Sequence, residues 1–203
     1  MSRIIAGAAG GLRLQSVPGR DTRPTTDRVK ESLFARLEAW GMLHEARVLD
    51  LFAGSGALGC EAASRGAASV TLVERHAPAA RVCRANAAVV HRALGRDDVV
   101  EVRHGAVGSY LADPTGGPWD LVLADPPYPL TEAELTAALA PLAGRLHAGG
   151  VVVVERSSRS PEPGWPAGLR RFERKRHGET TVWFAETDGA AELSPGARGG
   201  APR

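Results

Sequence analysis

From Arg47 onward, short apolar runs alternate with segments of helical periodicity, and this alternation constrains the fold more than any other feature of the chain. The expected strands span residues 47–51, 68–73, 99–103, 119–124 and 150–155, and the expected helices span residues 57–65, 77–94, 106–112 and 131–144. The run from Val151 to Val154 is wholly β-branched, as expected of a strand buried on both faces. The alternation predicts an α/β protein with a parallel sheet that is covered by helices on both sides.

The segment before this alternation predicts a small extension. Residues 3–6 and 12–15 flank a turn near Gly10-Gly11 and predict a short β-hairpin. A helix is expected to begin after Thr25 or Thr26 and to end at Gly41. Its apolar residues are spaced so that they share one helical face: Val29, Leu33, Leu37 and Trp40.

The segment after the alternation predicts a closing hairpin. Residues 169–176 and 180–185 flank His177-Gly178-Glu179 and read as two antiparallel strands. The following residues are rich in Gly, Ala and Pro and have no periodicity, which favours disorder. We therefore divide the chain into a basic N-terminal hairpin-and-helix extension (1–46), a core (47–185) and a disordered tail (186–203).

The run Asp125-Pro126-Pro127-Tyr128 directly follows the expected strand 119–124. Two consecutive prolines cannot continue a strand, because each lacks an N–H and restricts φ. The break holds a carboxylate and an aromatic ring at the carboxyl end of a strand, where open α/β sheets bind ligands. The alternative is a proline turn that only ends the strand.

These four residues suit a planar ring that carries an amino group. An exocyclic amine on a nucleobase is a poor nucleophile, because its lone pair is delocalised into the ring. Hydrogen bonds from the amine to the Asp125 carboxylate and the Pro126 carbonyl would localise that lone pair toward a methyl donor, and Asp125 would stabilise the developing positive charge. Tyr128 can stack on the base, which must first leave any helix.

A glycine-rich loop, Gly54-Ser55-Gly56-Ala57-Leu58-Gly59, follows the expected strand 47–51. The G-x-G-x-x-G pattern alone is compatible with a nicotinamide-dependent oxidoreductase, an S-adenosylmethionine-dependent methyltransferase or a tight turn. Glu74 ends the next strand about 20 residues after the first glycine, the spacing expected of a group that binds ribose hydroxyls.

Asp50 favours the methyltransferase among these alternatives. A carboxylate at this strand end would repel a pyrophosphate, but it can accept hydrogen bonds from water or from an ammonium group. S-adenosylmethionine carries such an ammonium group and no phosphate. Asp50 could also serve only as a helix or turn cap. Phe52 and Arg75, which lie beside these groups in the sequence, are assigned to the same cofactor site.

Composition narrows the remaining possibilities. The 203 residues fit one domain with appendages, no run of 18 apolar residues occurs, and the N-terminus lacks a signal-peptide core. Two cysteines, Cys60 and Cys83, fit a reducing compartment and read as small packed residues. The six histidines form no ligand pattern with them, so no metal is expected. We expect a cytoplasmic protein that does not contact a membrane.

Positive charge is concentrated in two blocks, although the formal net charge is only +2. Residues 1–30 carry six basic and two acidic residues, and residues 156–176 carry seven basic and two acidic residues. Two basic blocks around a mildly acidic core favour a polyanionic partner over two ordinary solvated surfaces.

With these motifs in place, the chain resembles a seven-stranded, Rossmann-like S-adenosylmethionine-dependent methyltransferase. More narrowly, it resembles the RsmD family, which methylates a guanine N2 in bacterial small-subunit (16S) ribosomal RNA. Four segments carry the resemblance: residues 23–34, 49–59, 124–128 and 175–180. The glycine loop and the Asp-Pro-Pro-Tyr run are shared by many amino-methyltransferases, whereas the Arg23-Pro24-Thr25 block and the basic Gly-Glu-Thr hairpin are more specific.

The resemblance implies a role for each part. Gly54, Ser55 and Gly56 would surround the methionine part of the cofactor with Asp50 nearby, and Glu74 would bind the ribose. Residues 125–128 would hold the target guanine. RNA phosphate would be contacted by residues of both basic blocks: Arg23, Thr25, Arg28, Lys30, Lys175 and Arg176. The substrate would be RNA within a partly assembled small subunit, and the enzyme would be a monomer.

One segment departs from the family pattern. Members often place an acidic residue after the strand that ends here at Arg103, where it binds the adenine amino group. This chain has His104-Gly105-Ala106-Val107 instead, so backbone groups of Ala106 and Val107 are expected to contact adenine.

Two rival functions share the fold. An adenine-N6 DNA methyltransferase would use the same chemistry, but a sequence-selective DNA enzyme would usually need a larger recognition domain than the segments flanking this core provide. A non-catalytic RNA-binding assembly factor would have no need of the intact Asp125–Tyr128 run. A nicotinamide oxidoreductase is a more distant alternative.

Overall fold

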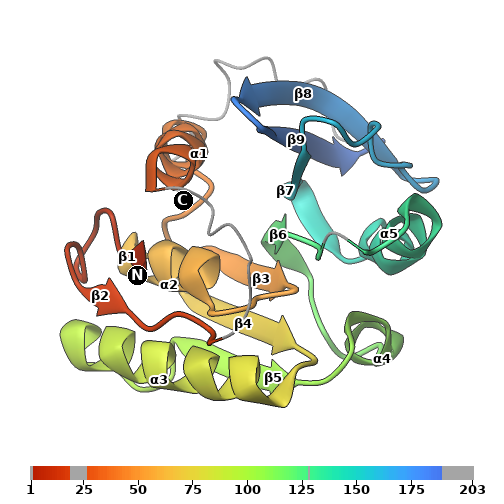
Figure 1. Ribbon diagram of the computed structural model, residues 1–203. Coiled ribbons are helices and arrows are strands. Elements are labelled where there is room, and N and C mark those ends of the chain that lie inside the picture. Colours follow the sequence, from red (N-terminus) through yellow and green to blue (C-terminus); the bar gives the residue numbers. More distant parts are fainter. Residues whose placement is uncertain (1, 19–26, 128, 189–203) are drawn as a thin grey trace.

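The structure, a computed structural model, describes residues 2–18, 27–127 and 129–188. Its main sheet contains seven strands: β3 (Arg47–Leu51), β4 (Ser69–Glu74), β5 (Val100–His104), β6 (Trp119–Ala124), β7 (Leu146–Ser157), β8 (Leu169–His177) and β9 (Thr180–Thr187). Their spatial order is β5-β4-β3-β6-β7-β9-β8 (Figure 1). The strands from β5 to β7 are parallel, and β9 pairs antiparallel with both β7 and β8. The expected α/β sheet with a C-terminal antiparallel hairpin is confirmed.

Helices cover both faces of this sheet. They are α1 (Asp27–Ala39), α2 (Ala57–Ser64), α3 (Ala77–Leu94), α4 (Val107–Ala112) and α5 (Glu132–Leu139), which a short 3₁₀ helix, η1 (Ala140–Leu142), extends. Figure 1 shows α1, α2 and α3 on one side of the sheet and α4 and α5 on the other. None of the helices in the described residues has both the length and the apolar character needed to cross a membrane.

Several boundaries differ from the expected ones; β7, for example, begins at Leu146 and not at residue 150. The helix expected over residues 131–144 is regular only to Leu139, because Pro141 has no N–H to donate and the chain tightens into η1. The last strand, β9, runs to Thr187 and so includes two residues assigned to the disordered tail. Glu186 is held there by pairing with Val151 and by a 2.9 Å salt bridge to Arg170. The rest of that tail, residues 189–203, lies outside the described residues.

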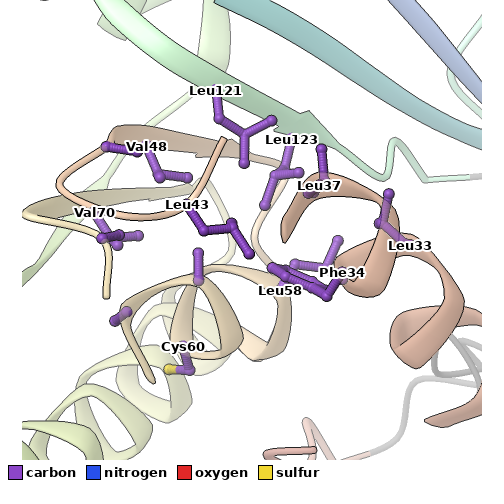
Figure 2. Close-up of a cluster of buried hydrophobic side chains, with 14 of the residues drawn as sticks. Leu33, Phe34, Leu37, Leu43, Val48, Leu58, Cys60, Val70, Leu121 and Leu123 are labelled. Atoms are coloured by element: carbon purple, nitrogen blue, oxygen red, sulfur yellow. The ribbon is translucent and has the colours of Figure 1, made fainter. Parts of the chain in front are cut away.

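The larger core fills the space between α1, α2, α3 and the sheet. Figure 2 shows Leu37 of α1 near Leu123 of β6 and Phe34 of α1 beside Leu58 of α2, all within one cluster of buried side chains. On its outer side α1 contacts the C-terminal hairpin, where the ring of Trp40 lies 5.5 Å from that of Phe172 and 5.2 Å from that of Phe184. The N-terminal helix α1 is therefore packed against the main sheet.

The expected N-terminal hairpin is present but short. Its strands are β1 (Ser2–Arg3) and β2 (Arg13–Leu14), which form a separate two-stranded sheet. So small a hairpin needs outside support. Glu61 of α2, which is fully buried, accepts hydrogen bonds from the amides of Ile5 (2.7 Å) and Ala6 (3.1 Å). The hairpin is thus attached to the helix that follows the glycine-rich loop.

Gly7 packs so closely on α2 that the attachment of the N-terminal hairpin should be sensitive to substitution there. Its φ is +82°, and an added Cβ would lie 2.0 Å from the Ser64 carbonyl oxygen. Gly11 has a similar φ of +83° but no atom within 4 Å of an added Cβ. We expect Gly7→Ala to lower the free energy of unfolding by about 1–3 kcal/mol more than Gly11→Ala. Denaturant unfolding of both variants measures this difference, and equal losses would show that the turn does not pack tightly on α2.

Candidate cofactor and substrate site

The loops that follow β3, β4 and β6 meet at one edge of the sheet. These strands are neighbours and parallel, with Leu51 paired to Val73 on one side and to Ala124 on the other. The residues that follow these three positions therefore emerge side by side at the carboxyl edge. The glycine-rich loop, Glu74 and Asp125, which are far apart in the sequence, are brought to one place, as the sequence predicts.

The glycine-rich loop has an unusual backbone that is held by its neighbours. Phe52, Gly54 and Gly56 have positive φ angles of 60°, 58° and 77°. The Ala53 amide donates to the Val73 carbonyl (3.0 Å), and the Gly56 amide donates back to the Ala53 carbonyl (2.7 Å). Gly56 is also the N-terminal cap of α2, so the loop leads directly into the amino end of a helix. That end favours negatively polarised ligand groups.

Glu74 supports the loop from the side. It is 4% exposed, and its two carboxylate oxygens accept from the amides of Gly54 (2.9 Å) and His76 (2.7 Å). The carboxylate therefore lies against the loop, at the position where the sequence predicts a ribose contact. Arg75, the next residue, is exposed, and its carbonyl lies 3.1 Å from Nε2 of His104.

Two side chains of α3 donate hydrogen bonds to carbonyl groups of the glycine-rich loop. The Cys83 thiol donates to the Gly54 carbonyl (3.1 Å), and the Asn86 side-chain amide donates to the Ser55 carbonyl (2.8 Å). Cys83 and Asn86 are three residues apart and lie on one face of α3. Burial raises the pKa of the Cys83 thiol, so it remains a neutral donor. The sequence predicts only packing for Cys83 and gives no signal for Asn86, since neither belongs to a recognisable motif.

Asp50 lies beneath the loop. Its side chain is 1% exposed, and Oδ2 accepts a 2.9 Å hydrogen bond from the Gly59 amide in the first turns of α2. Burial raises its pKa to about 8, and the nearby charges of Asp125 and Glu74 act in the same direction. Asp50 is therefore protonated at neutral pH in this state and helps to connect the strand end with α2.

This raised pKa predicts a pH-dependent stability. An unfolded aspartate has a pKa near 4, so the stabilisation linked to protonated Asp50 is complete at low pH and is lost as the pH rises toward 8. We expect the free energy of unfolding to fall by up to about 1.4 kcal/mol per pH unit between pH 6 and 8. Asp50→Asn, which keeps the acceptor for Gly59, should remove this slope. Urea unfolding of both proteins across this range measures it, and identical slopes would contradict the assignment.

The region expected to bind adenine lies at the carboxyl end of β5. Ala106 is the N-terminal cap of α4, while the Val107 side chain is buried. A hollow of about 390 Å³ lies beside these residues and is lined by residues of β4, β5 and α4: Val73, Val102, Arg103, His104, Gly105, Ser109 and Tyr110. The two predicted contact residues therefore lie next to a cavity, one exposed and one buried.

Asp125 emerges from β6 toward the glycine loop. It is partly buried, and burial raises its pKa to about 6 although the charge of Arg156 lowers it. Pro126 is buried, and the Pro127 carbonyl accepts from the Leu130 amide (2.9 Å) in the turn that follows. Tyr128, the predicted stacking ring, lies outside the described residues. The Asp125 carboxylate therefore lies at the carboxyl edge of the sheet and is charged above about pH 6.

Arg156 of β7 holds this turn in place, a role that the sequence reading missed. It is paired with Glu132 at the start of α5, and its Nη2 donates to the Leu130 carbonyl (3.3 Å). Its side chain is only 8% exposed. Arg156 therefore does not belong with the exposed cations of the second basic block, because its guanidinium binds Glu132 and the Leu130 carbonyl within the protein. A sequence cannot easily distinguish such an arginine from a surface one.

The residues predicted to contact RNA divide into three groups. Arg28 in the first turn of α1 and Lys175 and Arg176 of β8 are exposed. Arg23 and Thr25 lie outside the described residues. Lys30 is 1% exposed, and its Nζ donates to the Arg3 carbonyl (2.5 Å) and the Ser2 hydroxyl (3.2 Å). The prediction that Lys30 contacts phosphate is corrected: this ammonium group anchors α1 to the N-terminal hairpin.

Arg28 of the first basic block and Lys175 of the second both lie close enough to His177 to affect its charge. Arg36 of α1 forms a 2.5 Å salt bridge with Glu173 of β8. Burial lowers the pKa of His177, and the positive charges of Lys175, Arg36 and Arg28 lower it further. Residues about 140 positions apart in the sequence therefore create one positive field beside α1 and β8, as expected if both blocks face the same polyanion.

Comparison with known proteins agrees with this architecture. The model of the family described as Conserved hypothetical protein 95 matches residues 2–186. Ribosomal RNA small subunit methyltransferase D of Escherichia coli K12 is 33% identical over 190 residues, which cover 94% of this chain and 92% of that protein. The protein of the same name from Haemophilus influenzae is 37% identical over 138 residues, 68% of this chain and 69% of that protein.

A solved structure shows the same fold. The structure of yhhF from Escherichia coli superimposes with a TM-score of 0.77 at 32% sequence identity, covering 91% of this chain and 97% of that one. The span matched by the family model includes the N-terminal hairpin and the C-terminal strands, except for the last residue of β9. The chain therefore belongs to the family described as Conserved hypothetical protein 95, which includes the ribosomal RNA small subunit methyltransferase D proteins, and it is a methyltransferase.

Proposed function

We propose that this enzyme transfers a methyl group from S-adenosylmethionine to the exocyclic N2 of a guanine in 16S ribosomal RNA. The observation that carries the proposal is the position of Asp125: a partly buried carboxylate at the end of β6, beside a glycine-rich loop that leads into a helix. The relatives named ribosomal RNA small subunit methyltransferase D supply the substrate class.

The charges around the loop fit this cofactor. Asp125 and Glu74 lie close enough to Asp50 for both to raise its pKa, so three carboxyl groups gather at one edge of the sheet. The carboxylates of Asp125 and Glu74 favour the sulfonium and ammonium charges of S-adenosylmethionine and would oppose the diphosphate of a nicotinamide cofactor, while protonated Asp50 adds no repulsion between like charges. Glu74 and Arg75 at the end of β4 are proposed to hold the ribose, and Ala106 and Val107, which follow the cavity-lining Gly105, are proposed to hold the adenine.

The bound cofactor supplies an electrophilic methyl group, and the chain's own residues prepare the nucleophile. The Asp125 carboxylate and the Pro126 carbonyl accept hydrogen bonds from the guanine amino group, which directs its lone pair at the methyl carbon. Asp125 would stabilise the positive charge that develops on this nitrogen as it takes up the methyl group, and Asp125 or water would then accept its proton. Holding both reactants in line provides most of the rate enhancement.

The positive surface beside α1 and β8 is proposed to bind the RNA backbone. Arg28, Lys175 and Arg176 are exposed on it, and Arg23 and Thr25 belong to the adjoining segment. Phosphate contacts of this kind would orient the RNA while the target base leaves its helix and enters the site with Tyr128 as a stacking partner. We further propose that the enzyme acts as a monomer in the cytoplasm on RNA of a partly assembled small subunit.

Removing two of these cations should weaken RNA binding in a salt-dependent way. We expect the double variant Lys175→Ala, Arg176→Ala to lower RNA affinity about tenfold and to reduce the slope of log affinity against log salt by about 1–2. Arg92→Ala, which removes an exposed cation of α3, is the matched control and should change neither quantity. Filter binding at several salt concentrations measures both. An unchanged slope in the double variant would place the RNA elsewhere.

Labelled S-adenosylmethionine and small subunits from a strain that lacks this gene provide the test of the reaction. Label recovered as N2-methylguanosine, and lost with Asp125→Ala, supports the proposal. Label in methyladenosine would keep the chemistry but overturn the base. No label, with S-adenosylhomocysteine still bound, would favour a non-catalytic RNA-binding factor on the same fold.

A further inference from the structure

Arg156 and Asp125 lie near each other because two neighbouring strands end at the same edge of the sheet. Strands β6 and β7 are parallel, and Ala124 pairs with Val154. Asp125 is one residue beyond this pair on β6, and Arg156 is two residues beyond it on β7. Side chains alternate along a strand, so Arg156 shares the face of Val152 and Val154, which pack with α5. The guanidinium therefore lies close to both Asp125 and the first turn of α5.

Hydrogen bonds of Arg156 connect β7 with the turn that follows Asp125. Its Nη2 donates to the Leu130 carbonyl (3.3 Å) and to the Glu132 carboxylate. The Leu130 amide in turn donates to the Pro127 carbonyl (2.9 Å). The end of the turn is therefore attached to Arg156 on one side and to Pro127, two residues after Asp125, on the other.

The ion pair between Arg156 and Glu132 is incomplete. One bond joins Nη2 to Oε1, whereas Nε of Arg156 and Oε2 of Glu132 are buried and have no hydrogen-bond partner within the part of the chain that the structure describes. Arginine and carboxylate commonly form two parallel bonds, and a buried polar atom left unpaired lowers stability. Apolar side chains at both positions would avoid that cost. Stability alone therefore explains this pair poorly.

The charge of Arg156 also acts on Asp125. Burial raises the pKa of Asp125 to about 6, and the positive charge of Arg156 lowers it. The nearby acids oppose this effect where they are ionised: Asp50 on β3 interacts with Asp125, Glu74 on β4 interacts with Asp50, and Glu132 on α5 is paired with Arg156. Arg156 is therefore a cation at an edge of the sheet where carboxyl groups gather.

We propose that Arg156 is a positioning residue for methyl transfer, an inference that rests on the proposed function. Through Leu130 it fixes the turn that carries the Asp125 carboxylate and the Pro126 carbonyl. Its guanidinium also favours the ionised form of Asp125, the form that accepts a hydrogen bond from the amine and stabilises positive charge. Glu132 moderates this effect, because a paired carboxylate weakens the field that reaches Asp125.

The acidic limb of the pH–rate profile, in which kcat rises as Asp125 ionises, separates this role from simple support of the fold. It is measured by single-turnover methyl transfer to small subunits from a strain that lacks this gene. We expect Arg156→Gln to move the limb upward by about one pH unit and to lower kcat above it about tenfold, with S-adenosylhomocysteine affinity within about threefold. Loss of support alone would admit water to Asp125 and move the limb downward.

Two further variants examine the charge of the pair. Arg156→Lys keeps the positive charge but not the planar set of donors. We expect it to return the limb to its natural pH and kcat to within about threefold of the natural value. Glu132→Gln leaves the cation without its counter-charge and should move the limb downward. A purely structural pair would not give shifts of opposite sign, because loss of either partner breaks the same contact.

Arg65→Gln is the matched control. The Arg65 side chain is 5% exposed, and its Nε donates to the fully buried Glu61 carboxylate (2.7 Å), so it also belongs to a buried arginine–glutamate pair. Arg65 caps the C-terminal end of α2, whereas the glycine-rich loop leads into the N-terminal end. We expect Arg65→Gln to lower stability but to leave kcat and the acidic limb unchanged.

If Arg156→Gln does not fold, the double variant Arg156→Gln, Glu132→Gln takes its place, because it removes both charges together and leaves neither buried alone. The limb should again move upward. A limb that stays in place or moves downward in the folded variant overturns the positioning role, even if the RNA is methylated, and so does the same upward shift in Arg65→Gln. Methylation by the natural protein without any acidic limb would overturn this inference alone. Absence of methyl transfer by the natural protein would contradict the proposed function itself.

Discussion

Asp125→Ala is expected to lower kcat for methyl transfer by a factor of about 100–1000, while the affinity for S-adenosylmethionine changes by less than about threefold. The carboxylate acts on the amino group as positive charge develops, so its removal affects the transition state more than it affects binding of either reactant. The adjoining hydrogen-bond acceptor, the Pro126 carbonyl, belongs to the backbone and remains in the variant. Single-turnover kinetics with saturating cofactor measures the methyl-transfer step directly.

Asp125→Asn separates charge from shape. The amide keeps one oxygen acceptor and nearly the same volume but carries no negative charge. Because the pKa of Asp125 is raised to about 6, the natural enzyme should gain activity as the pH rises through 6 and the carboxylate ionises. In Asp125→Asn this limb of the pH–rate profile should disappear, and kcat should be low at every pH.

Asp97→Asn is the control for a simple change in net charge. Asp97 is exposed in the loop between α3 and β5, away from the carboxyl edge of β6. Its substitution should leave both kcat and the pH profile unchanged. Asp125→Asn with the activity of the natural enzyme would show that the amine needs no carboxylate, and the acceptor role would then fall to the backbone.

Local pattern accounts for the parts of the fold and site that the sequence predicts well. Strands buried on both faces leave a continuous apolar run, as in Val151–Val154, and their helices keep a clear period. Parallel strands place their carboxyl ends at one edge, so the meeting of Asp50, Glu74 and Asp125 follows from topology alone. The protonation state of each of these carboxyl groups does not follow from topology, because it depends on how deeply the group is buried.

Contacts between distant segments account for the parts that were missed. Lys30 lies three, four and seven residues before Leu33, Phe34 and Leu37, so helical spacing already places it on the buried face of α1. Its charge suggested a surface position, and only the Arg3 carbonyl and Ser2 hydroxyl explain how an ammonium group can be buried there. The partners of Asn86 and Arg156 likewise lie tens of residues away and leave no periodic signal.

Gly56→Ala is expected to weaken S-adenosylhomocysteine binding by a factor of about 100. Gly56 has a φ of +77° and caps α2, and an added Cβ would lie 2.8 Å from Cδ1 of Leu72 and 3.4 Å from Sγ of Cys83. A left-handed conformation costs alanine about 1–2 kcal/mol, and relieving the contact with Leu72 adds to that cost. The loop can avoid both by moving away from β4, which would displace the backbone proposed to surround the cofactor.

Gly95→Ala distinguishes this displacement from the general cost of a positive φ. Gly95 has a φ of +65° at the C-terminal cap of α3, and an added Cβ would meet no atom within 4 Å. Both variants therefore carry a similar backbone penalty, but only Gly56→Ala crowds the loop. We expect Gly95→Ala to lower the free energy of unfolding by about 1 kcal/mol and to bind S-adenosylhomocysteine as the natural protein does. Calorimetric titration of both variants with S-adenosylhomocysteine measures the two affinities. Equal, unimpaired affinities would mean that cofactor binding does not depend on this loop. Loss of affinity in Gly56→Ala alone would place the methionine end of the cofactor at the junction of β3 and α2.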